Sequence, residues 1–396
     1  MKRLLRIPVL LMLAVSIGCD NKPIITQLEV GREKLLGAGL AIEAAENLEK
    51  AEVEETSTLE PRVLLLLAYS HALSTGDAQS QGLAERFKQE RQKRLASLTD
   101  AEMKKILDLI AQRYRIQKDA MQVLIDKGAQ AVPLVIDSLG KNQFANAQND
   151  LSEILYRIGP KGLNLMTDAL SAPSVPIAVK RTLVQVIGRM SDPSAIPALE
   201  SKRKSGDAGL TMEINIALYQ LGKKDYRSEI IAGLSDRDVS ARRAAAKAMP
   251  EINDSPTDEI IKALKDPDPQ VRMYAAQALE KFPKKQATDS LIEILKADSN
   301  EETKQAVTQA LIVYGQQDFG KDLAARLIKE LPAVNQPNDR LRIVHILKTD
   351  AYKQQIKDAP KEDNLVYNLW KYATQDEKNE MVKSELYPLV DELPAN

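Results

Sequence analysis

The sequence is poor in the residues that most often carry catalysis or bind metals. Its 396 residues contain one cysteine, Cys19, and two histidines, His71 and His345. One cysteine cannot form an internal disulfide, and no Cys, His and acidic residues occur together with metal-binding spacing. A nucleophilic triad would need one of the histidines, and neither lies in a supporting motif. We therefore expect no catalytic activity, no metal and no cofactor, and we expect His71 to be a partly buried packing residue.

Aromatic residues and a net charge of either sign are also scarce. Aromatics make up 4% of the chain, whereas hydrophobic residues as a whole make up 44%. Packing by alanine and leucine suits closely stacked helices better than a β-sandwich. The 55 Lys and Arg residues nearly balance the 56 Asp and Glu residues, so a nucleic-acid partner is not expected. A glycine-rich phosphate loop is missing as well, and no small-molecule substrate is indicated.

What the sequence has instead is an internal repeat. Similar helical phrases end at six apolar residues that follow one another at intervals of 32, 31, 31, 30 and 32 residues: Ile158, Met190, Leu221, Ile252, Phe282 and Tyr314. We call these six the register residues. A period of about 20–50 residues is typical of a solenoid, in which each unit stacks on the next.

Each unit reads as an antiparallel pair of helices. One face of a first helix carries apolar residues with helical spacing: Val271, Tyr274, Ala275, Ala278, Leu279 and Phe282. The second helix of that unit has a similar face, formed by Ala287, Leu291, Ile294 and Leu295. In the preceding unit, we expect the second helix to begin with Ser255 as N-cap and Pro256 at the first helical position. A single pair cannot bury both faces, so the pattern predicts an all-α solenoid.

The spacing and the phrase from Asp266 to Arg272, DPDPQVR, resemble HEAT repeats of the short bacterial type named after phycobilisome lyases. The resemblance covers about residues 120–334 and is strongest over 229–315. It implies that the second helix of each pair lines a concave surface for a partner. On this chain that surface would carry Lys262, Lys265, Glu293, Lys296, Arg326 and Lys329.

The same resemblance implies a ladder of Asp–Arg pairs that joins neighbouring repeats. Basic residues recur ten positions before most register residues, and acids recur at the preceding turns. Arg242, Arg243 and Arg272 would be its basic members. The alternative is that these three arginines form an anion site. Because basic and acidic residues recur with the same period, the ladder is favoured.

Residues 29–116 are predicted to be helical but do not share the period. Leu36, Gly37, Leu40 and Pro61, with a Gly76-Asp77 turn, lie at spacings that weakly resemble a tetratricopeptide repeat. Thr99 and Glu102 form a capping-box pattern, which predicts a helix from Thr99 to about Gly128. The repeat array proper is predicted over 117–334.

The first 28 residues have the pattern of an export signal. A basic segment, residues 1–6, precedes an apolar stretch from Ile7 to Ile17, which is too short to span a membrane. The stretch ends at Gly18-Cys19 and resembles the lipobox of bacterial lipoproteins, although Ser16 departs from that motif. The resemblance implies a signal peptide at 1–18, an acylated Cys19, a tether at 19–28 and a lipid-anchored location on the extracytoplasmic face of the bacterial cell envelope. An ordinary secretory signal and an uncleaved anchor are the alternatives.

After residue 334 the period fails, and residues 335–396 are predicted to form a helical cap. This segment holds five of the chain's 16 aromatic residues: Tyr352, Tyr367, Trp370, Tyr372 and Tyr387. They could shield the last apolar face of the array or form a pocket for a partner. The sequence does not decide between these two uses.

These features together predict a non-catalytic, protein-binding scaffold that a lipid on Cys19 tethers to a membrane. The alternative is a relative or accessory subunit of a HEAT-type lyase or hydroxylase. The hydroxylases of this kind hold iron through His-Glu pairs, and the sequence contains no His-Glu dipeptide. The lyases act on cytosolic pigment proteins, whereas this chain begins with the pattern of an export signal.

Overall fold

The computed structural model describes residues 26–54, 59–204, 206–252 and 256–393. Over these ranges the chain consists of α-helices joined by short helical turns, and no β-strand occurs. The predicted all-α repeat fold is confirmed. The chain divides into two compact units, residues 1–158 and 159–396, which we call the N-terminal unit and the C-terminal unit. The predicted signal peptide and Cys19 lie outside the described residues.

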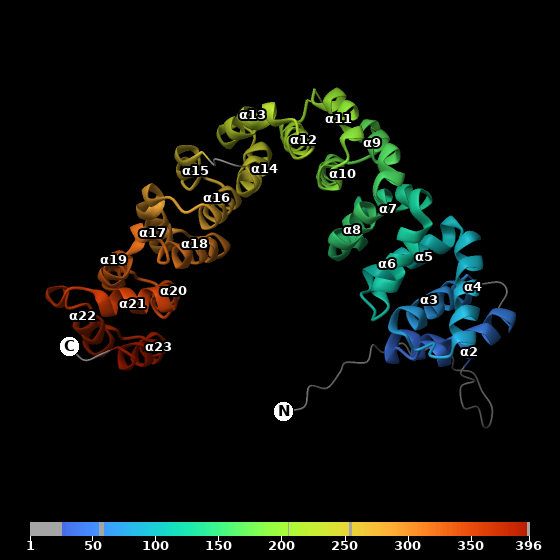
Figure 1. The fold of residues 1–396 in the computed structure, drawn as a ribbon, viewed down its shortest axis with the longest axis horizontal. Helices are drawn as coiled ribbons and strands as arrows, with labels where there is room; N and C mark the ends of the chain where they lie inside the picture. The colour runs from blue at the N-terminus through green and yellow to red at the C-terminus, as the bar shows by residue number, and fades with distance from the viewer. Residues whose placement is uncertain (1–25, 55–58, 205, 253–255, 394–396) are drawn as a thin grey trace, which may run out of the picture. The chain divides into compact units, whose positions relative to one another are not determined.

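The N-terminal unit is a set of helices packed around one apolar helix. Its helices are α1 (Gln27–Arg32), α2 (Ala41–Glu54), α3 (Glu60–Thr75), α4 (Gln81–Ala96), α5 (Asp100–Ala111), α6 (Gln117–Lys127), α7 (Val132–Leu139) and α8 (Gln148–Ile158) (Figure 1). A π-helical segment, Glu33–Ala38, follows α1. Helix α3 is buried from Val63 to Ser70 and packs against α2, α4, α5 and α6. Because α6 packs against both α3 and α8, the predicted boundary at 116/117 falls inside this unit.

The capping box at Thr99 forms, but the helix that it begins is shorter than predicted. The Glu102 carboxylate accepts a hydrogen bond from the Thr99 backbone N–H at 2.8 Å, and the Thr99 hydroxyl accepts one from Glu102 N–H at 3.3 Å. The helix α5 ends at Ala111, because Arg113 adopts a left-handed backbone with φ of 56°. This turn allows the Arg113 guanidinium to donate to the carbonyl of Asn146 at 2.6 Å. The prediction of one helix from Thr99 to Gly128 was wrong.

The C-terminal unit is a succession of helix pairs. Its helices are α9 (Leu163–Ser171), α10 (Ile177–Met190), α11 (Ile196–Lys202), α12 (Ala208–Gln220), α13 (Arg227–Ala232), α14 (Val239–Ala248), α15 (Thr257–Ala263), α16 (Pro269–Lys281), α17 (Thr288–Ala297), α18 (Glu301–Tyr314), α19 (Leu323–Glu330), α20 (Pro337–Leu347), α21 (Asp350–Asp358), α22 (Leu365–Lys371) and α23 (Glu380–Asp391). The predicted N-cap Ser255 lies outside the described residues. Pro256 occupies the N-cap position of α15 rather than its first turn.

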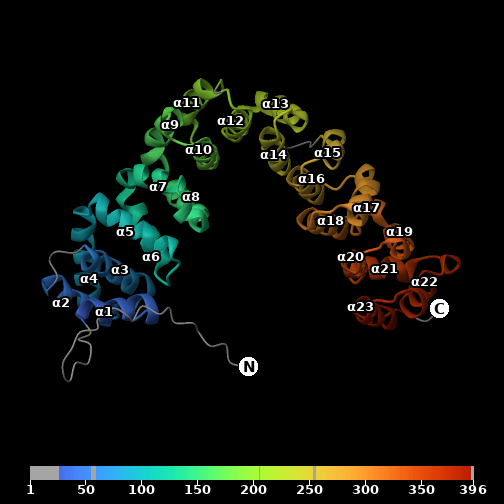
Figure 2. The ribbon, with the colours of Figure 1, turned by 180° about the vertical axis from the view of Figure 1, so that it is seen from behind.

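The helices of the C-terminal unit form two rows. Helices α10, α12, α14, α16, α18 and α20 each pack against the next one in that series, and they lie on the inner side of the curve that this unit follows (Figures 1 and 2). We call them the inner row, and we call α9, α11, α13, α15, α17 and α19 the outer row. Small residues bring the inner helices close together. A Cβ on Gly188 of α10 would lie 3.1 Å from the Cβ of Ala217 on α12.

The apolar faces predicted for the repeats are buried between helix pairs. Val271, Ala275, Ala278 and Leu279 of α16 are at most 1% exposed. Tyr274 and Phe282, the other residues of that predicted face, are half-buried. On α17, the corresponding face places Leu291, Ile294 and Leu295 in the core. These residues belong to one apolar cluster that extends from Met212 to Leu393, as expected for a stack in which each pair covers its neighbour.

Candidate functional site

The residues predicted to line the concave surface lie in the outer row. Lys262, Glu293 and Lys329 are exposed on α15, α17 and α19, and Lys265 is exposed just after α15. Lys296 pairs with Glu330, and Arg326 pairs with Asp289. The expected concave placement was therefore wrong: the closely packed side of the stack is formed by the first helix of each pair. A role of these six residues in binding stays a prediction.

The predicted ladder joins successive repeats through forked hydrogen bonds. Arg242 donates to Asp266 with Nε–Oδ2 at 2.7 Å and Nη2–Oδ1 at 3.2 Å. Arg272 repeats this pattern on Asp298 at 2.6 and 2.8 Å, and Arg243 pairs with Asp268. The guanidinium Nη1 of each fork also donates to two backbone carbonyls of the preceding turn. The arginines are thus held by carboxylates of the chain itself, which supports the ladder over the anion site.

A further rung of the ladder lies beyond the predicted end of the array. Arg340 on α20 donates to Glu377 with Nε–Oε2 at 2.7 Å and Nη2–Oε1 at 3.0 Å. Its Nη1 donates to the carbonyls of Val334 and Asn335 at 2.8 and 2.9 Å, as in the earlier rungs. Sequence reasoning missed this rung because its acid is Glu rather than Asp and follows the arginine by 37 residues, against 24 and 26 in the earlier rungs.

The C-terminal aromatic residues divide between core and surface. Tyr352 and Tyr372 are buried, and their hydroxyls donate to the Leu311 carbonyl at 2.6 Å and to Glu377 at 2.7 Å. Tyr367 and Trp370 stack with ring centroids 6.0 Å apart and are 57% and 44% exposed. Two aromatics therefore serve as a cap for the array, whereas the exposed pair lies on the surface of α22.

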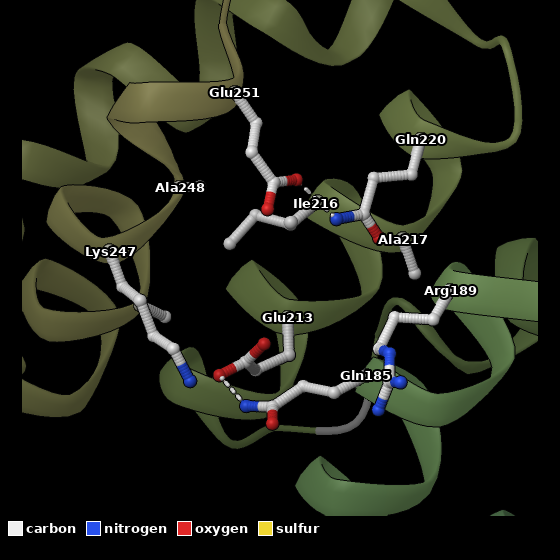
Figure 3. Close-up of a pocket in the computed structure, with 10 residues that line it drawn as sticks. Gln185, Arg189, Glu213, Ile216, Ala217, Gln220, Lys247, Ala248 and Glu251 are labelled. Carbon is white, nitrogen blue, oxygen red and sulfur yellow. Dashed lines mark hydrogen bonds between the residues drawn. The ribbon is translucent and has the colours of Figure 1, made fainter. Parts of the chain in front are cut away.

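A hollow of about 140 Å³ opens on the inner row between α10, α12 and α14 (Figure 3). It combines an apolar floor with polar and charged side chains: Gln185, Arg189, Glu213, Ile216, Ala217, Gln220, Ala244, Lys247, Ala248 and Glu251. We call it the Glu213 hollow. All of its residues lie within the C-terminal unit, so the stacking of three successive inner helices creates it.

Amide side chains hold the two carboxylates of the Glu213 hollow. Gln185 Nε2 donates to Glu213 Oε1 at 2.7 Å, and Gln220 Nε2 donates to Glu251 Oε2 at 2.7 Å. The Lys247 amine points toward the Glu213 carboxylate in Figure 3, and its positive charge acts on that carboxylate. No salt bridge to Glu213 forms among the described residues. Glu213 thus receives its hydrogen bond from a neutral group.

Glu213 differs electrostatically from the other perturbed carboxyl groups. Burial raises its pKa above the ordinary value of 4.5, and the Gln185 hydrogen bond and the charges of Lys247 and Arg181 only partly oppose this. The ladder acid Asp298 is also buried, yet its hydrogen bond with Arg272 holds its pKa below the usual range. A titratable group that burial perturbs in this way, in a hollow, is typical of a functional site.

The described residues outside the Glu213 hollow offer neither a metal site nor a nucleophilic triad. They contain no group of His, Cys, Asp or Glu side chains able to hold a metal ion. His71 lies partly buried, with Nδ1 2.7 Å from Asp119 Oδ2, and the Ser74 hydroxyl donates to Asp119 Oδ1 at 2.6 Å. Since Ser74 bonds the acid rather than the imidazole, these residues are not arranged as a nucleophilic triad. None of the described helices is long and apolar enough to cross a membrane.

A family model supports the repeat type over part of the chain. Residues 227–312 match the family model of HEAT repeats. An engineered protein of known structure is 15% identical and has a TM-score of 0.37, covering 93% of this chain and 100% of its own. The Escherichia coli protein YibA is 18% identical with a TM-score of 0.33, covering 76% of this chain and 95% of its own. No curated protein sequence matches the chain.

The repeat register gave only a weak signal for the Glu213 hollow. Glu213 precedes its register residue, Leu221, by eight positions, where the other repeats have Asp150, Thr182, Ala244, Tyr274 and Ala306. The next three repeats have a small or apolar residue there, but the first repeat also has a carboxylate. Because the residues of the hollow come from three successive inner helices, the sequence alone did not identify it.

Glu213→Gln should increase the free energy of unfolding at neutral pH by roughly 1 kcal/mol, because it removes a desolvated charge. The glutamine carbonyl can still accept the Gln185 hydrogen bond. Burial raises the pKa of Glu213 in the folded state above its value in the unfolded state. The contribution of Glu213 to folding stability is therefore most favourable below the unfolded-state pKa, and it is lost as the pH rises through the folded-state pKa. Urea unfolding should therefore show that Glu213→Gln stabilises the protein most at pH 7 and has almost no effect on stability near pH 4. Equal stabilisation at both pH values would show that the effect does not come from removing the Glu213 charge.

Proposed function

We propose that this chain is a non-catalytic scaffold that binds a protein partner along the inner row of its C-terminal unit. The observation that supports this most is the Glu213 hollow, which joins an apolar floor to a polar and charged rim. Protein interfaces have the same division between an apolar centre and a polar rim. Extended surfaces built from stacked repeats commonly bind other proteins.

Photo-crosslinking from single positions tests this proposal. A photoreactive residue in place of Gln277, which is exposed on α16 of the inner row, should trap one discrete protein in the native host. The same residue in place of Lys262, which is exposed on α15 of the outer row, should trap far less of it. Equal or stronger trapping from Lys262 would favour the outer surface that the sequence resemblance implied. Trapping from neither position would contradict a scaffold that works through this array.

The proposed scaffold is held at the extracytoplasmic face of a bacterial membrane by lipid on Cys19. The support is the sequence of the first 19 residues, in which the single cysteine follows a basic segment and a short apolar stretch. Two or three acyl chains, at about 0.8 kcal/mol per buried CH₂, would anchor the chain durably.

Cys19→Ser should abolish fatty-acid labelling in a bacterial host and leave unprocessed precursor, because the thiol is the acyl acceptor. Radiolabelled palmitate incorporation and the gel mobility of the precursor measure both effects. Ser16→Ala is the matched control, since it changes the same segment but keeps the thiol. Labelling that persists in Cys19→Ser would show that Cys19 is not the acylated residue.

A further inference from the structure

Glu213 forms no salt bridge among the described residues, unlike most carboxylates that are buried in this chain. Of the four carboxylates that are less than 9% exposed, three pair with Lys or Arg: Glu102 with Arg62 at 3.0 Å, Asp339 with Lys304 at 2.8 Å and Glu377 with Arg340 at 2.7 Å. Glu213 is half-buried and instead accepts a hydrogen bond from the Gln185 amide. A carboxylate partly removed from water is stabilised most by a cation in direct contact, whereas the Lys247 charge acts on Glu213 without a salt bridge.

The Glu213 hollow has the size for one side chain. Its volume is about 140 Å³, and cavities of about 150 Å³ hold a molecule the size of benzene. Oε1 of Glu213 is occupied by Gln185, whereas Oε2 accepts no hydrogen bond among the described residues and can accept one from a guest. Ile216 and Ala244, both less than 10% exposed, line the same hollow and offer an apolar surface to methylene groups.

We infer that the Glu213 hollow receives a lysine or arginine side chain of the protein partner, an inference that rests on the proposed scaffold function. Such a side chain has an apolar stem and a charged end, matching the apolar floor and the Glu213 carboxylate. Glu251, a second carboxylate, also lines the hollow, together with the cations Arg189 and Lys247. The guest cation replaces the missing partner of Glu213, and the buried charge then contributes to binding instead of opposing folding.

Lys247 competes with the guest cation for the Glu213 carboxylate. It is exposed on α14, and its amine points toward Glu213 (Figure 3). In the absence of a partner its charge partly compensates the carboxylate. A guest cation must therefore displace Lys247 or share the carboxylate with it, which gives substitutions at Glu213 and Lys247 opposite effects on binding.

Small probes test the charge preference of the hollow in the full chain. The probes are n-butylguanidinium, n-butylammonium and, as the anionic counterpart, pentanoate, and the readout is the ¹³C-methyl NMR signal of Ile216 during titration. We expect the two cations to bind more tightly than pentanoate. Glu213→Gln should weaken cation binding by about tenfold, and Lys247→Met should strengthen it by about threefold. Glu302→Gln, which removes an exposed charge of α18, is the matched control and should have no effect.

The pH adds an independent readout. Protonation removes the charge of Glu213, and its pKa is raised by burial. Cation binding should therefore begin to weaken at a pH above the ordinary value of 4.5 for this group, and the Glu213→Gln variant should lose that dependence. Both effects follow from one titrating group and can be measured in the same NMR series.

The outcomes separate this inference from the proposed function. If pentanoate binds more tightly than the cations, and Lys247→Met weakens pentanoate binding, the hollow is an anion site and the inference is overturned. Cation binding that is unchanged in Glu213→Gln would also overturn it. In either case, crosslinking from position 277 would still trap a partner if the scaffold proposal is correct, because Gln277 lies outside the hollow.

Discussion

Leu279→Ala should lower the free energy of unfolding by roughly 2–5 kcal/mol, through lost apolar burial and the cavity that remains. Leu279 is 1% exposed and lies in the middle of α16, where rigid neighbouring helices limit collapse of the space. Urea unfolding followed by circular dichroism measures the change. Leu165→Ala is the matched control: Leu165 is 38% exposed on α9, so its removal should change stability by about 0.5 kcal/mol or less.

The Leu279 variant also tests how far cooperativity extends along the stack. Each repeat contacts its neighbours, so lost stability should concentrate near the damaged repeat. Hydrogen exchange should show reduced protection over about residues 240–315, with little change at the ends of the C-terminal unit. A uniform loss of protection across residues 159–393 would mean that this unit unfolds as one cooperative body.

Arg340→Met should lower the free energy of unfolding by roughly 3–5 kcal/mol, because it leaves a buried carboxylate without its cation. Glu377 is 3% exposed, and its carboxylate accepts two hydrogen bonds from Arg340. Adding Glu377→Gln to this variant should restore much of the loss, since the uncompensated charge is then removed. Equal stability of the single and double variants would show that the pair contributes through packing alone.

The pH dependence of this variant has a defined sign. Burial opposes ionisation of Glu377, but the hydrogen bonds from Arg340 and Tyr372 outweigh it and hold its pKa below the ordinary 4.5. The pair therefore stabilises the folded state above pH 4.5, and this contribution is lost as the pH falls through the depressed folded value. Arg340→Met should make stability less dependent on pH in that acidic range than in the unmodified protein.

Periodicity predicted the architecture well because it follows from burial. Leu279 and Leu291 are apolar where their helices contact neighbours, so the repeat appears in the sequence without knowledge of the fold. The ladder was predictable for a related reason: Arg272 and Asp298 recur at fixed positions. The same method did not find the Arg340–Glu377 rung, which keeps the geometry and changes both the acid and the spacing.

Two features depended on information that periodicity does not contain. The inner row consists of the first helices of the pairs, whereas the resemblance to HEAT repeats assigned the concave side to the second helices. The Glu213 hollow depends on three residues from three different repeats, Gln185, Glu213 and Lys247, lying together. Each is unremarkable alone, and only their approach in space makes the carboxylate unusual.

The close approach of Gly188 to Ala217 has a consequence for how such a protein can change over evolution. If the radius of the stack is set by the size of side chains between inner helices, one added methyl group acts as a wedge that opens the arc locally. The helix pairs and their ladder need not change when this happens. Small substitutions between the inner helices would then change the curvature of the stack, while the exposed residues of the inner row change independently.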